Sequence, residues 1–254
     1  MQIEGLTVIV SGAASGIGRR FTEALLASGA QHVVGIDSNT ESLRALSSTL
    51  GDARLIPLEV DVSQERSIAA AMRQLHERDI VADVLVNNAG VLRDGRLATL
   101  DDSGYARKLP SAQWQSVLNT NLTGPFLLAR EFVAARLESA RQGGVIVNVS
   151  SVSSAGNPGQ SNYAAAKAGL DALTRTWSLE LAEYGIRVAG IAPGLTDTPM
   201  AATLNAAEAQ RLIAGMPLGR MITTQEIWLG LRFALECDAF NGRTLFIDGG
   251  GDGL

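Results

Sequence analysis

Cysteine and histidine are scarce in this sequence, and each shortage excludes a class of site. Cys237 is the single cysteine among 254 residues, so no internal disulfide can form and a reducing compartment is expected. His32 and His76 are the two histidines, and neither has other ligand-type residues at metal-binding spacing. We therefore expect no metal site.

Positive charge and long apolar runs are lacking as well. The 21 lysines and arginines are outnumbered by 26 acids, and no basic run occurs, so nucleic acid is not an expected partner. No window approaches the roughly 18 uninterrupted apolar residues of a membrane span. The first five residues lack the basic start of a signal peptide. A cytoplasmic protein without a membrane partner is the resulting expectation.

What the sequence does contain is a regular alternation of short β-branched runs and longer helical patterns. The predicted strands are residues 6–10, 32–36, 54–60, 84–86, 145–149, 187–192 and 244–247. The predicted helices are residues 17–28, 40–50, 64–78, 111–139, 162–184 and 224–235. This order predicts a doubly wound α/β fold, with a seven-stranded parallel sheet and helices on both faces. Because no repeat or linker interrupts it, we expect a single domain over residues 1–254.

A glycine-rich loop follows the first predicted strand directly. Residues 11–18 read SGAASGIG, which places Gly12, Gly16 and Gly18 in the spacing G-x-x-x-G-x-G. Glycines let the backbone turn sharply and approach a pyrophosphate, which would rest on the N-terminus of the next helix. Since the loop lies between a strand and an amphipathic helix, we interpret it as dinucleotide-binding rather than as a plain turn.

The second predicted strand runs into Asp37, about 20 residues after the glycine loop. An acid at this place can accept hydrogen bonds from the adenosine ribose hydroxyls of NAD, and it would repel the 2′-phosphate of NADP. No Arg or Lys follows it immediately. The sequence therefore favours NAD, although Asp37 could instead cap the following turn.

Two polar motifs follow the third and fourth predicted strands. The Asp61 side chain, in the pair Asp61-Val62, could reach the adenine amino group. Residues 87–90 read NNAG, and their small and amide side chains would tie strand ends together and border the cofactor.

The segment between Gly90 and Trp114 is polar and poorly periodic. Such segments in compact domains are usually functional or mobile, and this one leaves the sheet edge where ligands bind in open α/β folds. We expect it to help shape the substrate entrance. In the helix that follows, Asn119 and Asn121 are poor helix-interior residues and predict a local irregularity or a side-chain contact.

A candidate proton-transfer site combines Tyr163, Lys167 and a serine at a strand end. On a helix, residues four apart project from the same face. At about 5 Å and an effective dielectric near 20, an ammonium would favour the phenolate by roughly 3 kcal/mol, so Tyr163 would titrate around pH ~8. Ser150 could present its hydroxyl to the same oxygen. The group could serve an alcohol or a carbonyl; the alternative is an ordinary Tyr and Lys on a partly exposed helix.

These motifs, taken in order, resemble the short-chain dehydrogenase/reductase family over essentially the whole chain. They are SGAASGIG at 11–18, DV at 61–62, NNAG at 87–90, Asn121 of TNL, Ser150, YAAAK at 163–167 and APG at 192–194. The resemblance implies a Rossmann fold, a nicotinamide cofactor, a small-molecule substrate and a homotetramer in which the helices 111–139 and 162–184 pair across one interface.

The resemblance also implies a role for each catalytic residue. Tyr163 would be the general acid/base, and Ser150 would hydrogen-bond the substrate oxygen. Lys167 would bind the nicotinamide ribose and lower the pKa of Tyr163, while Asn121 would hold a water in a proton relay. Ser151 is the rival for the serine role, and Ser150 is preferred because its separation from Tyr163 matches the common spacing of the family.

The cofactor site implied by the same resemblance draws on every strand end. Its residues are Gly12, Ser15, Gly16, Ile17, Gly18, Asp37, Asp61, Val62, Asn88, Ala89, Gly90, Tyr163, Lys167, Pro193, Gly194, Thr196 and Thr198. The segment of about residues 196–217 corresponds to a mobile lid over the substrate. Its apolar members Met200, Leu204, Leu212 and Met216 would suit a greasy substrate, or would only pack the lid down.

The expected activity is NAD-dependent interconversion of a secondary alcohol and a ketone by hydride transfer. The long 90–114 segment and Asp37 are similar to type II 3-hydroxyacyl-CoA dehydrogenases and to bacterial dehydrogenases of cyclic secondary alcohols. Two alternatives stay open. One is an NADPH-dependent 3-oxoacyl reductase, and the other is a non-catalytic NAD-binding sensor on the same fold.

Overall fold

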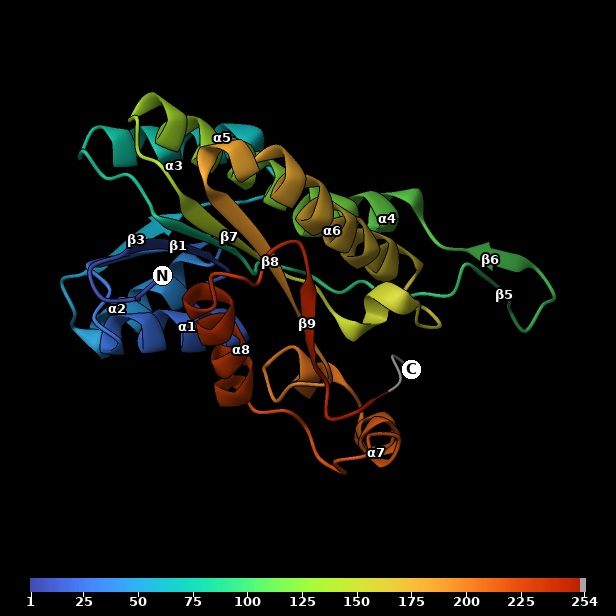
Figure 1. The fold of residues 1–254 in the computed structure, drawn as a ribbon. Helices are drawn as coiled ribbons and strands as arrows, with labels where there is room; N and C mark the ends of the chain where they lie inside the picture. Colours follow the sequence, from blue (N-terminus) through green and yellow to red (C-terminus); the bar gives the residue numbers. More distant parts are fainter. Residues whose placement is uncertain (252–254) are drawn as a thin grey trace.

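Seven parallel strands form one twisted sheet in the computed structural model, which describes residues 1–251 (Figure 1). The strands are β1 (Thr7–Ser11), β2 (His32–Asp37), β3 (Leu55–Glu59), β4 (Val84–Asn87), β7 (Gly144–Val149), β8 (Ile186–Pro193) and β9 (Thr244–Ile247). Their order, β3-β2-β1-β4-β7-β8-β9, reverses direction between β1 and β4, which confirms the doubly wound prediction. The predicted domain extends to residue 254, and residues 252–254 lie outside the described part.

The central strands are apolar because both faces of the sheet are covered. All five residues of β1 and all six of β7 are buried. Val8 pairs with Val33 of β2 on one side and with Val84 of β4 on the other. Continuous burial explains why these strands read as unbroken apolar runs rather than as alternating ones.

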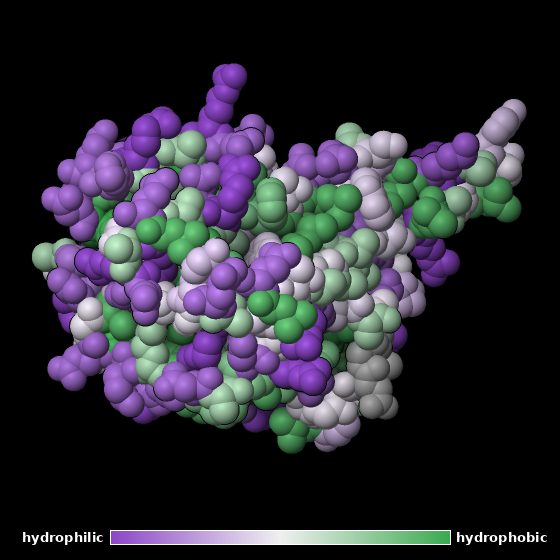
Figure 2. Space-filling model, turned by 45° about the horizontal axis from the view of Figure 1, so that its top comes forward, coloured by the Kyte–Doolittle hydropathy of each residue, from purple (hydrophilic) through white to green (hydrophobic). Residues whose placement is uncertain are grey.

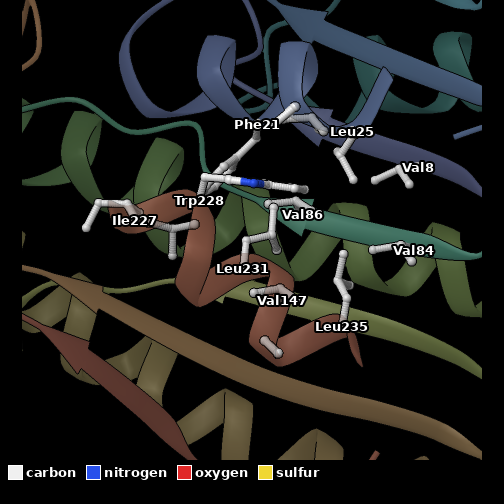
Figure 3. Packing of buried hydrophobic residues seen from close by; sticks show 14 of the residues in the cluster. Val8, Phe21, Leu25, Val84, Val86, Val147, Ile227, Trp228, Leu231 and Leu235 are labelled. Atoms are coloured by element: carbon white, nitrogen blue, oxygen red, sulfur yellow. The ribbon is translucent and has the colours of Figure 1, made fainter. Parts of the chain in front are cut away.

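Helices cover the sheet in two layers (Figure 1). One layer holds α1 (Gly16–Ala27), α2 (Thr40–Leu50) and α8 (Thr224–Glu236); the other holds α3 (Glu65–His76), α4 (Ser111–Leu118), α5 (Gly124–Glu138) and α6 (Ser161–Glu180). Each layer closes its own hydrophobic core against the sheet. Figure 3 shows Trp228 and Leu231 of α8 pointing at Val86 in the first of these cores. None of the helices within residues 1–251 is long and apolar enough to cross a membrane.

The predicted helix 111–139 is interrupted rather than continuous. A single π-helical turn, η1 (Asn119–Thr123), separates α4 from α5. Asn121 lies in this turn, and its side chain exchanges two hydrogen bonds of 2.9 Å with the backbone N–H and C=O of Val91. The irregularity and the side-chain contact predicted from the two asparagines are therefore both present.

The segment 90–114 contains structure that the sequence pattern did not indicate. Two short antiparallel strands, β5 (Ala98–Leu100) and β6 (Ala106–Lys108), form a hairpin that projects beyond α4 (Figures 1 and 2). Its turn is held by Asp101, whose Oδ1 accepts hydrogen bonds from the N–H groups of Ser103 and Tyr105. Polar turn residues fill half of the hairpin, so its alternation was too short to recognise.

Short helical turns complete the chain around the sheet. They are η2 (Val152–Ala155) after β7, η3 (Ala182–Tyr184) after α6, and η4 (Ala201–Thr203) with α7 (Ala206–Ala214) after β8. The last two belong to the expected lid, for which no helix was predicted. The carboxyl ends of β1, β2, β4, β7 and β8 face this side of the molecule, where the site lies.

Candidate active site

The glycine loop at the end of β1 has left-handed backbone angles that favour glycine and little room for side chains. Gly12 and Gly16 have φ angles of +66° and +50°. A Cβ on Gly12 would lie 2.9 Å from the Cα of Ala89, and a Cβ on Gly18 would collide with the carbonyl oxygen of Gly12. The loop therefore lies tightly between β4 and the start of α1.

The first turn of α1 is suited to bind an anion. Ser15 is its N-cap residue, and no acidic side chain occupies the first turn. The free N–H groups and the helix dipole there favour negative charge, and the glycine loop leaves the backbone accessible. These features fit the pyrophosphate of a dinucleotide. Ile17, on the same turn, packs against the hydrophobic core.

Hydrogen bonds from Ser11 and Asn88 join the ends of β1 and β4. The Asn88 side-chain amide donates to the carbonyl oxygen of Ser11 at 2.9 Å, and the backbone N–H of Ala89 donates to the Ser11 hydroxyl at 3.0 Å. Gly90 lies beside Asn121, since a Cβ there would be 3.5 Å from the Asn121 Oδ1. The role expected for residues 87–90, tying strand ends together, is what these contacts perform.

Asp37 performs one of the two roles considered for it, the capping of a turn, and its contact with a ribose stays a prediction. Its Oδ2 accepts a hydrogen bond of 3.1 Å from the N–H of Ala14 in the glycine loop, and its Oδ1 accepts one of 3.0 Å from Asn39. The carboxylate thus caps a turn and stands beside the loop at the end of β2. Asp61 is exposed, and its Oδ1 accepts from the N–H and hydroxyl of Ser63. Contact of Asp61 with adenine stays a prediction.

The segment after β8 closes over the glycine loop. Thr198 lies next to it, because a Cβ on Gly16 would be 3.4 Å from the Thr198 Cβ. Thr196 is buried, and its hydroxyl donates to the carbonyl oxygen of Gly194 at 3.0 Å. Gly194 cannot be enlarged, since a Cβ would lie 2.7 Å from the Cα of Asp248. Pro193 ends β8 immediately before this segment.

Tyr163 and Lys167 project from the same face of α6, as their spacing predicts. The Lys167 Nζ lies 5.5 Å from the centroid of the Tyr163 ring. It is buried, and it donates a hydrogen bond of 2.6 Å to the carbonyl oxygen of Val149 at the end of β7. The lysine is thereby fixed between α6 and the sheet.

The structure places the hydroxyls of the two candidate serines differently. Ser150 is 3% exposed, and its hydroxyl donates to the backbone carbonyl of Lys167 at 3.3 Å, away from the tyrosine hydroxyl. Ser151 is the serine whose hydroxyl lies toward Tyr163 and lowers its pKa. Neighbouring residues at a strand end point in opposite directions, so only one of the two can face the tyrosine. The family spacing points to Ser150, whereas the side-chain directions favour Ser151, and the catalytic role of either serine stays a prediction.

The predicted pKa of about 8 for Tyr163 is also wrong. Burial raises the pKa of Tyr163 to about 12, and the Ser151 hydroxyl lowers it only partly. Burial lowers the pKa of Lys167 to about 8. Both shifts have the same main cause, because burial disfavours the charged form of each group. The charged Asp94 side chain further raises the Tyr163 pKa.

Several residues near Tyr163 were not singled out from the sequence. The Asp94 Oδ2 accepts a hydrogen bond of 2.9 Å from the Gln160 side chain, and the Asn162 side chain donates to the carbonyl oxygen of Arg93 at 2.9 Å. These bonds fasten the loop after β4 to the first turn of α6. Lone Asp, Gln and Asn residues in loops carry no spacing signal, so only their contacts identify them.

A pair of buried amide side chains connects the strands and the helix that carry the site. The Asn87 side chain donates to Asn148 at 2.9 Å, and Asn148 donates to Thr174 of α6 at 2.9 Å. All three are buried, so each hydrogen bond offsets a desolvation cost and holds β4, β7 and α6 in register. The one available signal was an Asn at the end of each of two neighbouring strands.

The arrangement can transfer a proton at one end and hold a dinucleotide at the other. Tyr163 and Ser151 present hydroxyls at the carboxyl end of β7, and the glycine loop, Asp37 and Thr198 form the adjoining surface. Asn121, Asn88 and Gly90 lie between these two parts. Among the side chains that the structure describes, which are those of residues 1–207 and 209–251, no three His, Cys, Asp or Glu gather as metal ligands.

Comparisons with known proteins agree with this geometry. Residues 6–209 match the family model described as short chain dehydrogenase. The 3-oxoacyl-[acyl-carrier-protein] reductase FabG of Escherichia coli K12 is 34% identical over 252 residues, covering 98% of each chain. FabG of Thermotoga maritima is 35% identical over 258 residues, covering 98% of this chain and 99% of its own. A solved structure of a candidate gluconate dehydrogenase from Agrobacterium tumefaciens superposes with a TM-score of 0.87 at 30% identity, covering 98% and 96% of the two chains.

Proposed function

The chain belongs to the short-chain dehydrogenase family and is therefore an oxidoreductase. We propose that it interconverts a secondary alcohol and a ketone with NAD as cofactor. The observation that carries the proposal is the group of Tyr163, Ser151 and Lys167, which stands beside a glycine loop whose backbone suits a pyrophosphate. The carboxylate of Asp37, hydrogen-bonded to that loop, supports NAD over NADP.

The chain would hold the cofactor through three groups. The glycine loop and the first turn of α1 would receive the pyrophosphate, Asp37 the adenosine ribose, and Lys167 the nicotinamide ribose. The nicotinamide, when bound, supplies or accepts the hydride. Asp37 would discriminate against NADP because a second negative charge at the 2′ position would lie close to its carboxylate.

Tyr163 would handle the proton. Because burial raises its pKa to about 12, the phenol is protonated at neutral pH and can donate to a carbonyl oxygen as that oxygen gains negative charge. The Ser151 hydroxyl would hydrogen-bond the same oxygen and stabilise its charge. Lys167 would orient the site through its bond to Val149, and Asn121 would keep the loop after β4 in place through Val91.

The relatives favour a more specific candidate, a 3-oxoacyl reductase. Two similar chains carry the name 3-oxoacyl-[acyl-carrier-protein] reductase, and they support this candidate better than a dehydrogenase of simple alcohols. Asp37 is the feature that argues against NADPH as its reductant.

An exposed apolar side chain on the lid favours a substrate with an apolar part. Met216 is buried against the core and serves to pack the lid, whereas Met200 is 40% exposed and available to a ligand. The two interpretations of these side chains thus apply to different residues. We propose that the lid, residues 196–217, and the loop after β4 together bound the substrate.

The test is a set of initial rates measured at 340 nm. NADH and NADPH would each be offered with 3-oxoacyl thioesters of several chain lengths, and NAD and NADP with 3-hydroxyacyl thioesters and with linear and cyclic secondary alcohols. We expect NADH-dependent reduction of a 3-oxo substrate, lost in Tyr163→Phe although this variant still binds NADH. Turnover unchanged in Tyr163→Phe would refute the site, and a preference for NADPH would refute the role of Asp37.

A further inference from the structure

The backbone carbonyl of Arg93 receives two side-chain hydrogen bonds from two different helices. The Gln113 side chain, in the first turn of α4, donates to it at 2.7 Å, and the Asn162 side chain, in the first turn of α6, donates to it at 2.9 Å. Both lone pairs of this carbonyl oxygen are therefore used. The Gln113 side chain also donates to the carbonyl oxygen of Asp94 at 3.0 Å. The loop after β4 is thus joined to both helices at this point.

Residues 93–95, which we call the junction, are bonded to the loop before α6 as well. The Asp94 carboxylate accepts a hydrogen bond of 2.9 Å from the Gln160 side chain. The backbone N–H of Gly95 donates to the carbonyl oxygen of Gly159 at 2.8 Å. The junction is therefore held on one side by α4 and on the other by the start of α6.

Asn162 connects the junction to Tyr163. Its side-chain oxygen accepts a hydrogen bond of 2.8 Å from the backbone N–H of Tyr163, while its side-chain nitrogen donates to Arg93. That N–H belongs to the first turn of α6, where the helix itself offers no acceptor, and the N-cap residue Gln160 provides no side-chain cap. A single amide therefore caps α6 and fixes it to the junction.

The burial of Asn162 makes these two hydrogen bonds hard to replace. Asn162 is 0% exposed, and removing one partner of a buried hydrogen bond leaves the other unsatisfied. Without this amide, the N–H of Tyr163 would lose its acceptor, whereas Arg93 would keep the bond from Gln113. The junction also acts on the phenol, since the charged Asp94 side chain raises the pKa of Tyr163.

We propose that Asn162 positions Tyr163 for proton transfer by holding its turn of α6 against the junction, and that Gln113 supports the junction from α4. This inference rests on the proposed function in one respect, that Tyr163 donates the proton. A proton donor must lie within hydrogen-bond reach of the substrate oxygen, and a displacement of about 1 Å can lower the rate by about 10²-fold. Asn162 and Gln113 act through Tyr163 and the junction, without touching the substrate.

The first experiment observes Tyr163 without any substrate. The chain has three tyrosines, Tyr105, Tyr163 and Tyr184, so tyrosine labelled with 13C at Cζ gives three NMR signals, one of which Tyr163→Phe assigns. We expect Asn162→Ala to shift or broaden the Tyr163 signal and to leave the other two in place. A Tyr163 signal identical to that of the wild type would overturn the proposal, whatever the enzyme reduces.

The second experiment measures kcat on the substrate for which Tyr163→Phe has lost turnover. Asn162→Ala should lower kcat by roughly ten- to a hundredfold, while the Kd of NADH stays within a few-fold of the wild type. Asn162→Asp keeps an oxygen for the N–H of Tyr163 and loses the donor to Arg93, so it separates the helix cap from the link. It should lower kcat as Asn162→Ala does, and a wild-type kcat in Asn162→Asp would overturn the role of the junction.

Gln113 provides a test that leaves the buried amide in place. Its side chain is partly exposed, so Gln113→Ala keeps the proposal testable if the Asn162 variants do not fold. This variant should disturb the Tyr163 signal and lower kcat less than Asn162→Ala, because Arg93 keeps one donor. In the double variant, kcat should fall no further than in Asn162→Ala alone, since Gln113 acts on Tyr163 only through that link. Losses that multiply would contradict a shared route.

Asn241→Ala is the matched control. The Asn241 side chain also joins distant segments, since its Oδ1 accepts a hydrogen bond of 2.9 Å from the N–H of Val188, near the amino end of β8 and away from the site. The control should lower the melting temperature and leave both the Tyr163 signal and kcat unchanged. A loss of kcat in the control equal to that in Asn162→Ala would overturn the proposal. Turnover unchanged in Tyr163→Phe would instead refute the proposed function.

Discussion

At the scale of single residues, the two adjacent serines after β7 give the sharpest test of the site. The Ser151 hydroxyl lies toward Tyr163 and lowers its pKa, whereas the Ser150 hydroxyl is turned toward the backbone of Lys167. Ser151→Ala should lower kcat by about 10²–10³, the range for removing one stabilising donor at a developing oxyanion. Ser150→Ala, the matched control, should retain kcat within a few-fold. Steady-state rates with a saturating substrate would check both. A larger loss of kcat in Ser150→Ala than in Ser151→Ala would support Ser150, the serine chosen from family spacing.

The buried Lys167 predicts a pH dependence of stability. Its folded pKa of about 8 lies below the ordinary value of 10.5, so between these two pH values the unfolded chain holds a proton that the folded chain has lost. By linkage, the contribution of Lys167 to stability rises from pH 8 to 10.5, by on the order of 1–3 kcal/mol. Below pH 8 the cost of the buried ammonium is fully present.

The variant Lys167→Met isolates this contribution. Between pH 8 and 10, the free energy of unfolding of the wild type should increase relative to that of the variant. The pKa of Tyr163 is raised to about 12, so this residue lowers the free energy of unfolding only above its ordinary pKa of 10. It does so in both the wild type and the variant. Urea denaturation at several pH values measures the difference, and a difference independent of pH would mean that Lys167 is not desolvated.

At the scale of elements, the turn from β1 into α1 depends on a glycine with no room for a side chain. A Cβ on Gly18 would collide with the backbone of Gly12, so Gly18→Ala must displace the loop that approaches the pyrophosphate. We expect at least a tenfold loss of NADH affinity and a lowered melting temperature. Fluorescence titration with NADH would measure the affinity.

A matched control for that substitution is Gly51→Asn. Gly51 has a left-handed φ of 58° at the end of α2, and a Cβ there would meet nothing within 4 Å. Asn tolerates this backbone region, so the variant should bind NADH as the wild type does. Equal losses in both variants would show that the effect is a general loss of stability rather than damage to the loop.

Secondary structure was predictable where a segment buries a face, because its apolar residues then recur at a regular period. It was missed where a segment buries no face. The central strands of the sheet are continuous apolar runs, and all seven strands appear close to their predicted places. The π turn at Asn121 was foreseen only as an irregularity, since the side chain that stabilises it bonds a residue 30 positions away. The hairpin of β5 and β6 has no buried face, so no apolar periodicity marks it.

At the scale of the whole molecule, cofactor binding should stabilise the fold selectively. A ligand that binds only the folded state stabilises it by about 2.7 kcal/mol at 100 times its Kd. With Asp37 beside the glycine loop, NADH should raise the melting temperature more than equal NADPH. In Asp37→Ser the two shifts should converge, because the carboxylate that repels a 2′-phosphate is gone. Differential scanning fluorimetry would check this, and a larger shift with NADPH in wild type would exclude the NAD preference.

The amino-acid sequence by itself determined the sheet, the glycine loop and the pairing of Tyr163 with Lys167. These follow from periodicity, from the steric freedom of glycine and from a four-residue spacing on a helix, all of which are local. The family and its fold followed from the same motifs in order.

Only the tertiary structure decided which serine faces Tyr163, how strongly that tyrosine holds its proton, and what the loop after β4 contacts. These features depend on contacts between segments far apart in the chain. Among them are the contact of Ser150 with Lys167 and the bonds that join Asp94 to Gln160 and Asn162 to Arg93. Desolvation depends on every neighbour at once, and a spacing rule that counts only two charges therefore gave the wrong sign for the pKa of Tyr163.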